Sequence, residues 1–213
     1  MQTMTDITLY AWATPNSHRA IIMLEELGVP YRLHPVNIRA GEQFRPPMDT
    51  LNPFGKVPVL TWREAEGSRT LSESGAILLR LAERYGRLLP AQGASRDAVL
   101  QWLMVALTGL APATGQAHHW RDLARERVDA AIAHAVAAVQ RVYELLENRL
   151  EDHDYLAGDY SIADIAAYPW VVRCGWAGLR LDDYPAVAGW HGRLSERLAV
   201  QRGMAQPPGV TLD

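Results

Sequence analysis

Residues 7–28, ITLYAWATPNSHRAIIMLEELG, decide the fold, because a strand pattern gives way there to a helix pattern across one short turn. The β-prone residues of Ile7–Trp12 predict a strand. After the turn, apolar residues recur at the i, i+3, i+4, i+7 spacing of one helix face, at Ala20, Met23, Leu24 and Leu27. Gly28 can then end the helix in a left-handed conformation. The stretch therefore predicts a strand, a turn and a helix in that order.

The pattern continues beyond Gly28 with three strands and one helix. Tyr31–Ile38 alternates like a strand, and it can pair with the first strand in parallel because a helix connects the two through a right-handed crossover. Past a loop rich in Gly and Pro, the segments VPVLTW at 57–62 and SRTL at 68–71 flank the turn-like EAEG and predict a hairpin. A helix over 73–85 follows. The predicted order is β-α-β-β-β-α.

From about Gly86 the chain changes character and becomes helical. The stretch GRLLPAQGAS at 86–95 is typical of a linker. Beyond it, Asp129–Leu150 places apolar residues at steps of three and four, which predicts one helix of ~33 Å. We therefore expect two domains, an α/β domain over residues 1–87 and an all-helical domain over residues 95–213.

A second helix of the later domain has a clear start signal in DYSIADIAAYPWV. Ser161 and Asp164 stand at the spacing of a capping box, in which each side chain accepts a hydrogen bond from the backbone of the other residue. Pro169 lies eight residues beyond the cap and is expected to kink the helix, because it removes an amide donor and crowds the carbonyl four residues back.

The composition fits a soluble, folded protein that acts on a small molecule or a protein. Of its 213 residues 48% are hydrophobic and 21% charged, and the net charge of -3 with a pI near 6.2 gives no reason to expect a nucleic-acid partner. A single cysteine, Cys174, excludes an internal disulfide framework and suits a reducing compartment. The start MQTMTDITLY does not have the pattern of a signal peptide, and no run approaches ~18 consecutive apolar residues. We expect a cytoplasmic protein without a membrane segment.

Taken together, these segments resemble the cytosolic glutathione transferases, in which a thioredoxin-like domain is followed by a helical bundle. The resemblance covers nearly the whole chain and rests on GKVPVL, LSESGAILLRLAERYG and YSIADIAAYPWV. The combination of TPN, EQFRP, ESGAILL, LQWL, GQAHHW and SIADIAAYPW is similar to the bacterial Nu-class branch. That branch consists of glutathione-dependent disulfide reductases with weak conjugating activity. The resemblance implies glutathione as co-substrate, room for a second glutathione in the site, and a two-fold homodimer.

Glutathione is an extended, charged tripeptide, and several residues suit its binding. The resemblance implies a cis bond before Pro58, so that the backbone of Val57 pairs with the cysteinyl residue like a short strand; the alternative is an ordinary edge-strand proline. Glu73 and Ser74 stand at a helix start, where free amides attract the γ-glutamyl carboxylate and Glu73 can bind its ammonium. Plain capping by Ser72 or Ser74 is the alternative reading.

The loop before the third strand adds two residues that only the resemblance assigns. It places Gln43 and Lys56 beside the glutathione backbone and the glycyl carboxylate. For Lys56, a merely solvated lysine is the alternative.

The glutathione thiol needs help to ionise, because a free thiol has a pKa of ~8.5. Pro15 fits the first turn of a helix, so Thr14 and Asn16 lie at its positive end, where a sulfur could dock. We predict Asn16 as the main sulfur-stabilising residue and Thr14 as its partner, with simple helix capping by either as the alternative. Tyr10 is a rival, since a tyrosine on the first strand serves in other branches, but its position favours packing in or near the sheet.

The first domain contains no cysteine, so disulfide exchange there cannot use an enzyme thiol and the attacking sulfur must arrive with glutathione. The later Cys174 is predicted to be a small buried residue rather than a nucleophile. The leading prediction is therefore a disulfide reductase. Two alternatives remain. One is an ordinary conjugating or dehalogenating transferase with a role in detoxification, and the other is a non-catalytic glutathione-binding regulator.

Three histidines complete the candidate residues. Adjacent His118 and His119 do not share a helix face, and no metal is expected; they are predicted to line the interdomain cleft, with Trp12 and Trp120 nearest to it. The resemblance places His134 where relatives carry an arginine that reaches the partner subunit's glutathione. Because a histidine pairs with a carboxylate only in its charged form, this difference is expected to weaken the second glutathione at neutral pH.

Overall fold

The computed structural model describes residues 4–209, which form two compact units. One unit consists of the chain up to Arg87 together with the segment from Leu198, and the other of Leu88–Arg197. The final helix thus belongs by its contacts to the first unit, whereas the division expected from sequence, 1–87 and 95–213, assigns it to the second.

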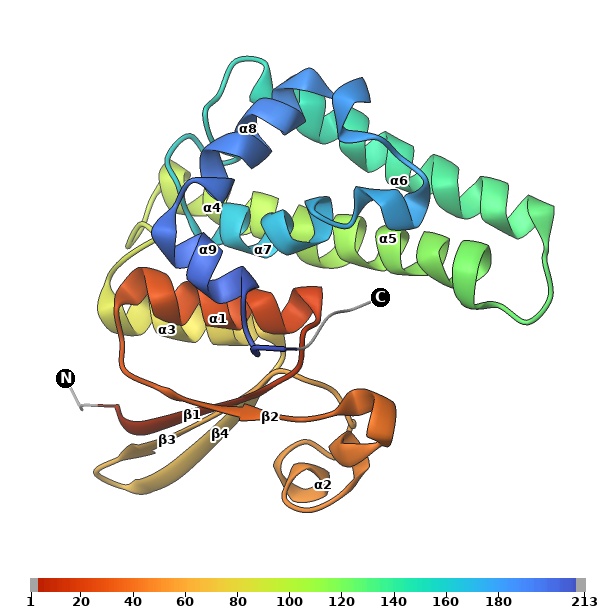
Figure 1. Ribbon diagram of the computed structural model, residues 1–213. Coiled ribbons are helices and arrows are strands. Elements are labelled where there is room, and N and C mark those ends of the chain that lie inside the picture. Colours follow the sequence, from red (N-terminus) through yellow and green to blue (C-terminus); the bar gives the residue numbers. More distant parts are fainter. Residues whose placement is uncertain (1–3, 210–213) are drawn as a thin grey trace. The chain divides into compact units, whose positions relative to one another are not determined.

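The first unit has a four-stranded sheet in the order β2-β1-β3-β4 (Figure 1). Its strands are β1 (Thr5–Ala11), β2 (Arg32–Pro35), β3 (Val59–Glu64) and β4 (Gly67–Ser72). β1 and β2 are parallel, and β3 is antiparallel to both β1 and β4, so the crossover and the hairpin are confirmed. β2 is shorter than the predicted strand over Tyr31–Ile38. The Val36 amide still donates to the Ala11 carbonyl at 2.9 Å, but the chain then turns into a 3₁₀ helix that Asn37 caps.

Helices cover both faces of this sheet. Figure 1 shows α1 (Pro15–Leu27) and α3 (Ser74–Tyr85) side by side over one face, toward which the fully buried Leu9 and Leu60 point. On the opposite face, Val59 packs with Met48 of α2 (Met48–Leu51). α9 (Leu198–Met204) lies against α1, and its Gly203 comes so close that a Cβ atom there would stand 2.6 Å from Ile22 Cγ1.

The stretch predicted as a loop rich in Gly and Pro contains short helical turns. In addition to α2, it forms the 3₁₀ turns η1 (Ile38–Ala40) and η2 (Glu42–Phe44). The Asn37 side chain caps the first of them by accepting hydrogen bonds from the amides of Arg39 and Ala40. Helices of three or four residues have too few turns to show an apolar period, so the sequence pattern does not reveal them.

The second unit is all helical, as predicted. It contains α4 (Ala94–Met104), α5 (Ala111–His118), α6 (Asp129–Leu150), α7 (Ile162–Val171) and α8 (Pro185–Ser195). The π-helical segment η3 (Val105–Leu110) joins α4 to α5, and a second one, η4 (His119–Leu123), continues α5. The 3₁₀ turns η5 (Cys174–Ala177) and η6 (Leu181–Asp183) precede α8. α6 has the bounds expected from its apolar period.

The predicted capping box at the start of α7 is confirmed. The Ser161 side chain accepts from the first turn, and Asp164 accepts from the Ser161 amide at 3.0 Å. The buried Asp164 also accepts from the Leu156 amide and from Trp190 Nε1, at 3.0 and 2.9 Å, so it ties α7 to α8 and to the preceding loop. The helix continues through Pro169 to Val171.

The run Ala94–Leu123 has the length and composition to cross a membrane, alone among helices in the described part of the chain. The search of the sequence for ~18 consecutive apolar residues does not detect this run, because polar residues interrupt its apolar ones. Leu103 and Leu110 are fully buried within the second unit, and the run packs against α7.

Candidate functional site

A cavity of about 230 Å³ in the first unit brings together most of the predicted site residues. Its lining consists of Asn16, Phe54, Lys56, Val57, Pro58, Glu73 and Ser74. These residues come from three places that lie far apart in sequence, namely the start of α1, the loop before β3 and the start of α3. Six of the seven were predicted, and Phe54 is the exception.

The start of α1 supplies Asn16, while Thr14 acts as the cap. Thr14 Oγ1 accepts a hydrogen bond from the Ser17 amide at 3.2 Å and donates to Ser17 Oγ at 3.0 Å. Asn16, at the second helical position, lines the cavity. The positive end of a 13-residue helix therefore faces this space, and Asn16 is the side chain of TPN that reaches it.

The start of α3 supplies Glu73 and Ser74 in an unusual backbone conformation. Glu73 stands at the N-cap with φ 70° and ψ 115°, a region that costs a non-glycine residue energy and that is found mainly at functional sites. Within residues 4–209 no side chain caps this helix, so the alternative reading, plain capping by Ser72 or Ser74, is not supported. The first amides of α3 are therefore oriented for an anionic ligand in the cavity.

The loop before β3 is held by Asn52, a buried residue that the sequence reading missed. Its Nδ2 donates to the Lys56 carbonyl at 2.9 Å, and its Oδ1 accepts from the Phe54 amide at 3.3 Å. The Val57–Pro58 bond is cis, as expected, and both residues line the cavity. The Lys56 ammonium lies 5.8 Å from the centre of the exposed Phe54 ring.

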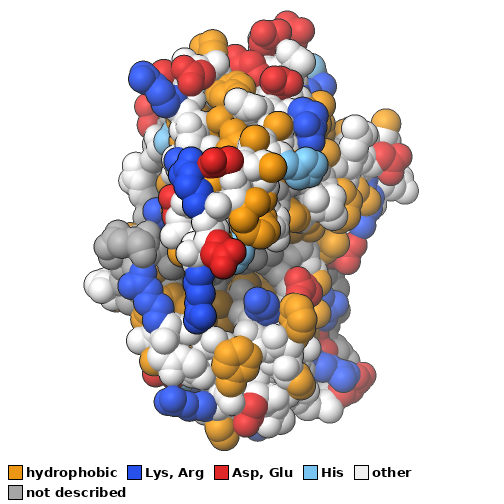
Figure 2. Space-filling model, turned by 90° about the vertical axis from the view of Figure 1, so that its right-hand side faces the viewer, with side chains coloured by type: hydrophobic (Ala, Val, Ile, Leu, Met, Phe, Trp, Pro, Cys, Tyr) orange, Lys and Arg blue, Asp and Glu red, His pale blue; other side chains and the backbone are white. Residues whose placement is uncertain are grey.

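Gly55 lets this loop approach η2 closely. Its φ is +65°, and a Cβ atom built on it would clash with Cε1 of Phe44. Both phenylalanines are highly exposed, at 66% for Phe44 and 70% for Phe54. Figure 2 shows one face of the molecule, on which hydrophobic side chains lie among acidic and basic ones.

Four other candidates lie outside the lining of this cavity. Thr14 is occupied with the helix cap, and Tyr10 packs against His34 on the sheet, with ring centres 4.8 Å apart. Gln43 lies on η2, and its Oε1 is buried with no hydrogen-bond partner among the described residues, which leaves it able to accept from a ligand amide. His134 belongs to the second unit.

In that unit, His134 lines a cavity of about 430 Å³ between α5 and α6. Its walls are mainly apolar, formed by Pro112, Ala113, Ala131, Ala135 and Ala138, with Gln116 and Trp120 beside them. Such a space suits an aromatic or alkyl group next to one polar anchor.

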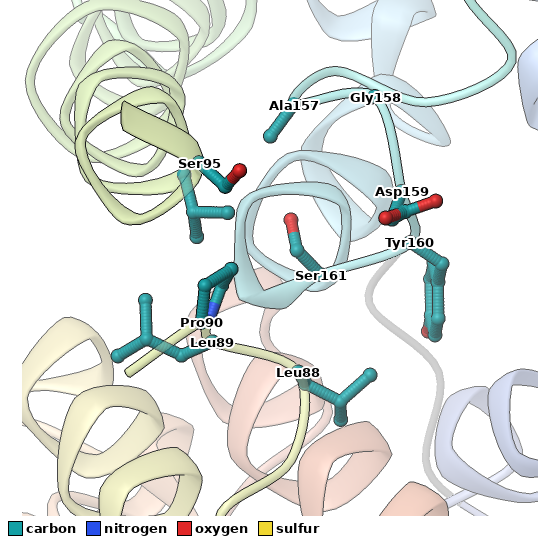
Figure 3. A pocket seen from close by; sticks show the side chains of 10 residues that line it. Leu88, Leu89, Pro90, Ser95, Ala157, Gly158, Asp159, Tyr160 and Ser161 are labelled. Atoms are coloured by element: carbon teal, nitrogen blue, oxygen red, sulfur yellow. The ribbon is translucent and has the colours of Figure 1, made fainter. Parts of the chain in front are cut away.

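Figure 3 shows a further cavity of the second unit, about 610 Å³ in volume, under the start of α7. The linker residues Leu88, Leu89 and Pro90 form one wall, Ser95 of α4 another and the loop Ala157–Ser161 the third. Ser161, which lines this cavity, is engaged in the capping box of α7.

The remaining candidates fit structural roles. Cys174, predicted to be a small buried residue, is half-buried, and burial raises the pKa of its thiol, which makes it a poor nucleophile. His118 stacks on Trp176 at 4.2 Å, and burial lowers its pKa. Among residues 4–209 no three His, Cys, Asp or Glu side chains form a group that could hold a metal ion.

A sheet of this topology with a cavity between two helix starts and a cis-proline loop, together with an all-helical unit, defines a thioredoxin-like protein of the glutathione-binding class. Residues 13–84 match the N-terminal domain model of the glutathione S-transferases and residues 129–193 match the C-terminal one. The chain therefore belongs to the glutathione S-transferase family, which confirms the predicted family and fold.

Individual relatives share nearly the whole chain. The disulfide-bond oxidoreductase YfcG of Escherichia coli is 42% identical over 204 residues, covering 93% of this chain and 94% of YfcG. A glutathione transferase structure from Burkholderia graminis, with two glutathione molecules per subunit, is 34% identical with a TM-score of 0.89, over 96% of this chain and 90% of the other. A glutathione transferase structure from Pseudomonas putida, with one glutathione disulfide per subunit, is 32% identical with a TM-score of 0.88. The match covers 95% of this chain and 92% of the other.

Proposed function

We propose that this protein is a glutathione-dependent disulfide-bond reductase with weak conjugating activity. The observation that carries the proposal is the position of Asn16 at the positive end of α1, in a cavity of the first unit, while the chain's single cysteine lies in the second unit. The name of YfcG, a disulfide-bond oxidoreductase, supports the same activity. The nucleophile is then the glutathione sulfur and not a sulfur of the protein.

The cavity residues divide the recognition of glutathione among them. Ser74 and the first amides of α3 bind the γ-glutamyl carboxylate, and Glu73 binds the ammonium. The backbone of Val57 pairs with the cysteinyl residue, while Lys56 and Gln43 contact the glycyl end. Asn16 donates to the sulfur and, with the dipole of α1, favours the thiolate.

The reaction proceeds in two balanced exchanges. The thiolate of bound glutathione attacks one sulfur of the substrate disulfide, forms a mixed disulfide and releases the other sulfur as a thiolate, which takes a proton from water. A second glutathione thiolate then attacks the glutathione sulfur of the mixed disulfide. The products are glutathione disulfide and the second substrate thiol. The protein aligns the sulfurs and stabilises the negative charge.

The second glutathione and the partner subunit belong to this proposal. The Burkholderia graminis structure, with two glutathione molecules per subunit, supports room for both. We place His134 near the second one, and we propose a two-fold homodimer that works in the cytoplasm.

The proposal is tested by measuring reduction of 2-hydroxyethyl disulfide by glutathione beside conjugation of an aryl halide. We expect reduction to dominate, and Cys174→Ser to retain the full rate because no enzyme thiol takes part. Conjugation that exceeds reduction by orders of magnitude would instead support a conventional transferase, for which the apolar cavity beside Trp120 is suited. Glutathione binding without turnover of either substrate would support a regulator.

A further inference from the structure

Arg19 is a charged residue buried behind the candidate site. It lies on α1 one turn after Asn16, is only 2% exposed and is among the largest fully buried side chains of the chain. Burial lowers the pKa of its guanidinium to about 9, so it still carries its charge at neutral pH. Because a buried charge costs several kcal/mol per ion in desolvation, a structural role alone would be met as well by an apolar side chain of similar size.

The contacts of Arg19 join the two helix starts that line the cavity. Its Nη1 donates to Asn16 Oδ1 at 2.8 Å and to Ser74 Oγ at 3.2 Å. Asn16 belongs to the start of α1 and Ser74 to the start of α3, which are 58 positions apart in sequence (74 minus 16). One guanidinium therefore holds a residue proposed to face the sulfur and a residue proposed to face the γ-glutamyl carboxylate.

The bond to Asn16 fixes which end of its amide faces the cavity. A guanidinium has only donors, so the atom of Asn16 that points to Arg19 must be the oxygen. The amide nitrogen, with its two donors, is then the other end of the amide group, and the Asn16 side chain lines the cavity. A sulfur there meets a donor, which stabilises a thiolate, and not an acceptor, which would favour the protonated thiol.

The bond to Ser74 has the same effect on a hydroxyl group. Ser74 Oγ accepts from Arg19, so its own hydrogen is directed to another acceptor. The side chain is buried and lines the cavity, where the anion of the γ-glutamyl group would be that acceptor. Both ends of the site thus present donors, and a positive charge stands behind them.

We infer that Arg19 is a positioning residue of the glutathione site, which holds Asn16 and Ser74 as donors toward the bound thiolate and carboxylate. This inference rests on the proposed function. In this role Arg19 does not touch the ligand, but it makes the site favour the thiolate of bound glutathione over the protonated thiol. A purely structural Arg19 would tie α1 to α3 without changing the acidity of the thiol, and this difference can be measured.

The experiment compares Arg19→Met and Arg19→Lys with the wild type, and uses Arg80→Met as the control. Arg80 is an arginine of the same unit that pairs with Glu64 at 2.7 Å, away from the cavity. The ionisation of bound glutathione is followed by the ultraviolet absorbance of the thiolate against pH. Affinity for S-methylglutathione, which has no ionisable thiol, reports the γ-glutamyl end separately.

We expect Arg19→Met to raise the pKa of the bound thiol by about one unit, because a nearby positive charge and an oriented donor are lost. Its affinity for S-methylglutathione should fall roughly fivefold, the value of one hydrogen bond. Arg19→Lys should keep most of the acidity but lose affinity, since an ammonium cannot reproduce the fork of a guanidinium. Arg80→Met should change neither.

The inference is overturned if Arg19→Met folds and leaves both the thiol pKa and the affinity unchanged. If that variant does not fold, Arg19→Lys decides the question in a double-mutant cycle with Ser74→Ala, read as the affinity for S-methylglutathione. Additive effects on this affinity overturn the inference, and coupling supports it. If the wild type neither binds glutathione nor reduces a disulfide, the proposed function fails first and the inference falls with it.

Discussion

Thr14 Oγ1 and the Ser17 amide are joined by a hydrogen bond of 3.2 Å that caps α1 at the edge of the candidate site. The same hydroxyl donates to Ser17 Oγ at 3.0 Å. The Thr14 hydroxyl is therefore used both as a donor and as an acceptor within the first turn of α1. The structure thereby separates the two polar residues of TPN. Thr14 organises the helix start, and Asn16 lines the cavity.

Thr14→Ala is expected to lower stability more than it changes the chemistry. Loss of the cap should reduce the free energy of unfolding by about 1 kcal/mol, while Thr14→Ser should retain it. Urea unfolding measures the stability, and a pH titration of bound glutathione measures the thiol. A rise of the thiol pKa in Thr14→Ala as large as in an Asn16 variant would show that Thr14 contacts the sulfur directly.

Asn16→Asp is a sharper test of Asn16 than Asn16→Ala. Aspartate keeps an oxygen acceptor for Arg19, so stability should stay within about 1 kcal/mol of the wild type, but it replaces a donor by a negative charge near the sulfur. The kcat/KM for disulfide reduction should fall about 100-fold.

Asn16→Ala should in contrast lose about 1–3 kcal/mol of stability as well, because a buried donor of Arg19 loses its acceptor. Thermal or urea unfolding of the two variants in parallel provides the control. A normal rate in Asn16→Asp would contradict the role assigned to Asn16.

Gly55→Ala should weaken glutathione binding through the loop that it disturbs. Gly55 and Gly28 both have positive φ, at +65° and +67°, so alanine should cost about 1–2 kcal/mol of stability at either position. At Gly55 the new Cβ also collides with the Phe44 ring, whereas at Gly28 nothing lies within 4 Å. Only Gly55→Ala should therefore raise the KM for glutathione. Equal KM values in the two variants would show that the loop tolerates the collision.

Much of the fold can be predicted from the sequence where the signal is local. The bounds of α6 follow from an apolar period that is repeated over 22 residues, and the start of α7 follows from the capping box of Ser161 and Asp164. The hairpin of β3 and β4 follows from two strand patterns around a short turn. In each case the residues that determine the element are close in sequence.

Long-range features could not be predicted in this way. The packing of α9 on α1 depends on Gly203 meeting Ile22, and a pattern within either helix does not indicate it. In the site, the Arg19 contact with Ser74 bridges 55 positions. A local signal did exist for Arg19, since it follows Asn16 by three positions on a helix and so shares its face. The sequence reading did not use it.

The stability of the second unit should fall on acidification, partly because of His191. Its ring stacks on Tyr168 at 5.1 Å, and burial lowers its pKa below the ordinary value of ~6.5. As the pH falls through this value, the unfolded chain takes up the proton before the folded one, so the free energy of unfolding decreases. Urea midpoints between pH 7 and pH 5 should decline less in His191→Gln than in the wild type. His119→Gln, at an exposed position, is the control, and an equal decline in all three proteins would assign the effect to other groups.

His134→Arg should strengthen the binding of a second glutathione. His134 is exposed on α6 and lines the cavity with Trp120, and the family resemblance places an arginine at this position. Arginine stays charged at every physiological pH and can bind a carboxylate with two parallel hydrogen bonds, so the affinity at neutral pH should rise roughly tenfold. Calorimetric titration with glutathione gives the stoichiometry and both affinities. Ala133→Arg places the same charge on the next, exposed residue, outside the cavity lining. An equal gain in both variants would indicate general attraction by charge, and no gain in His134→Arg would place the second glutathione elsewhere.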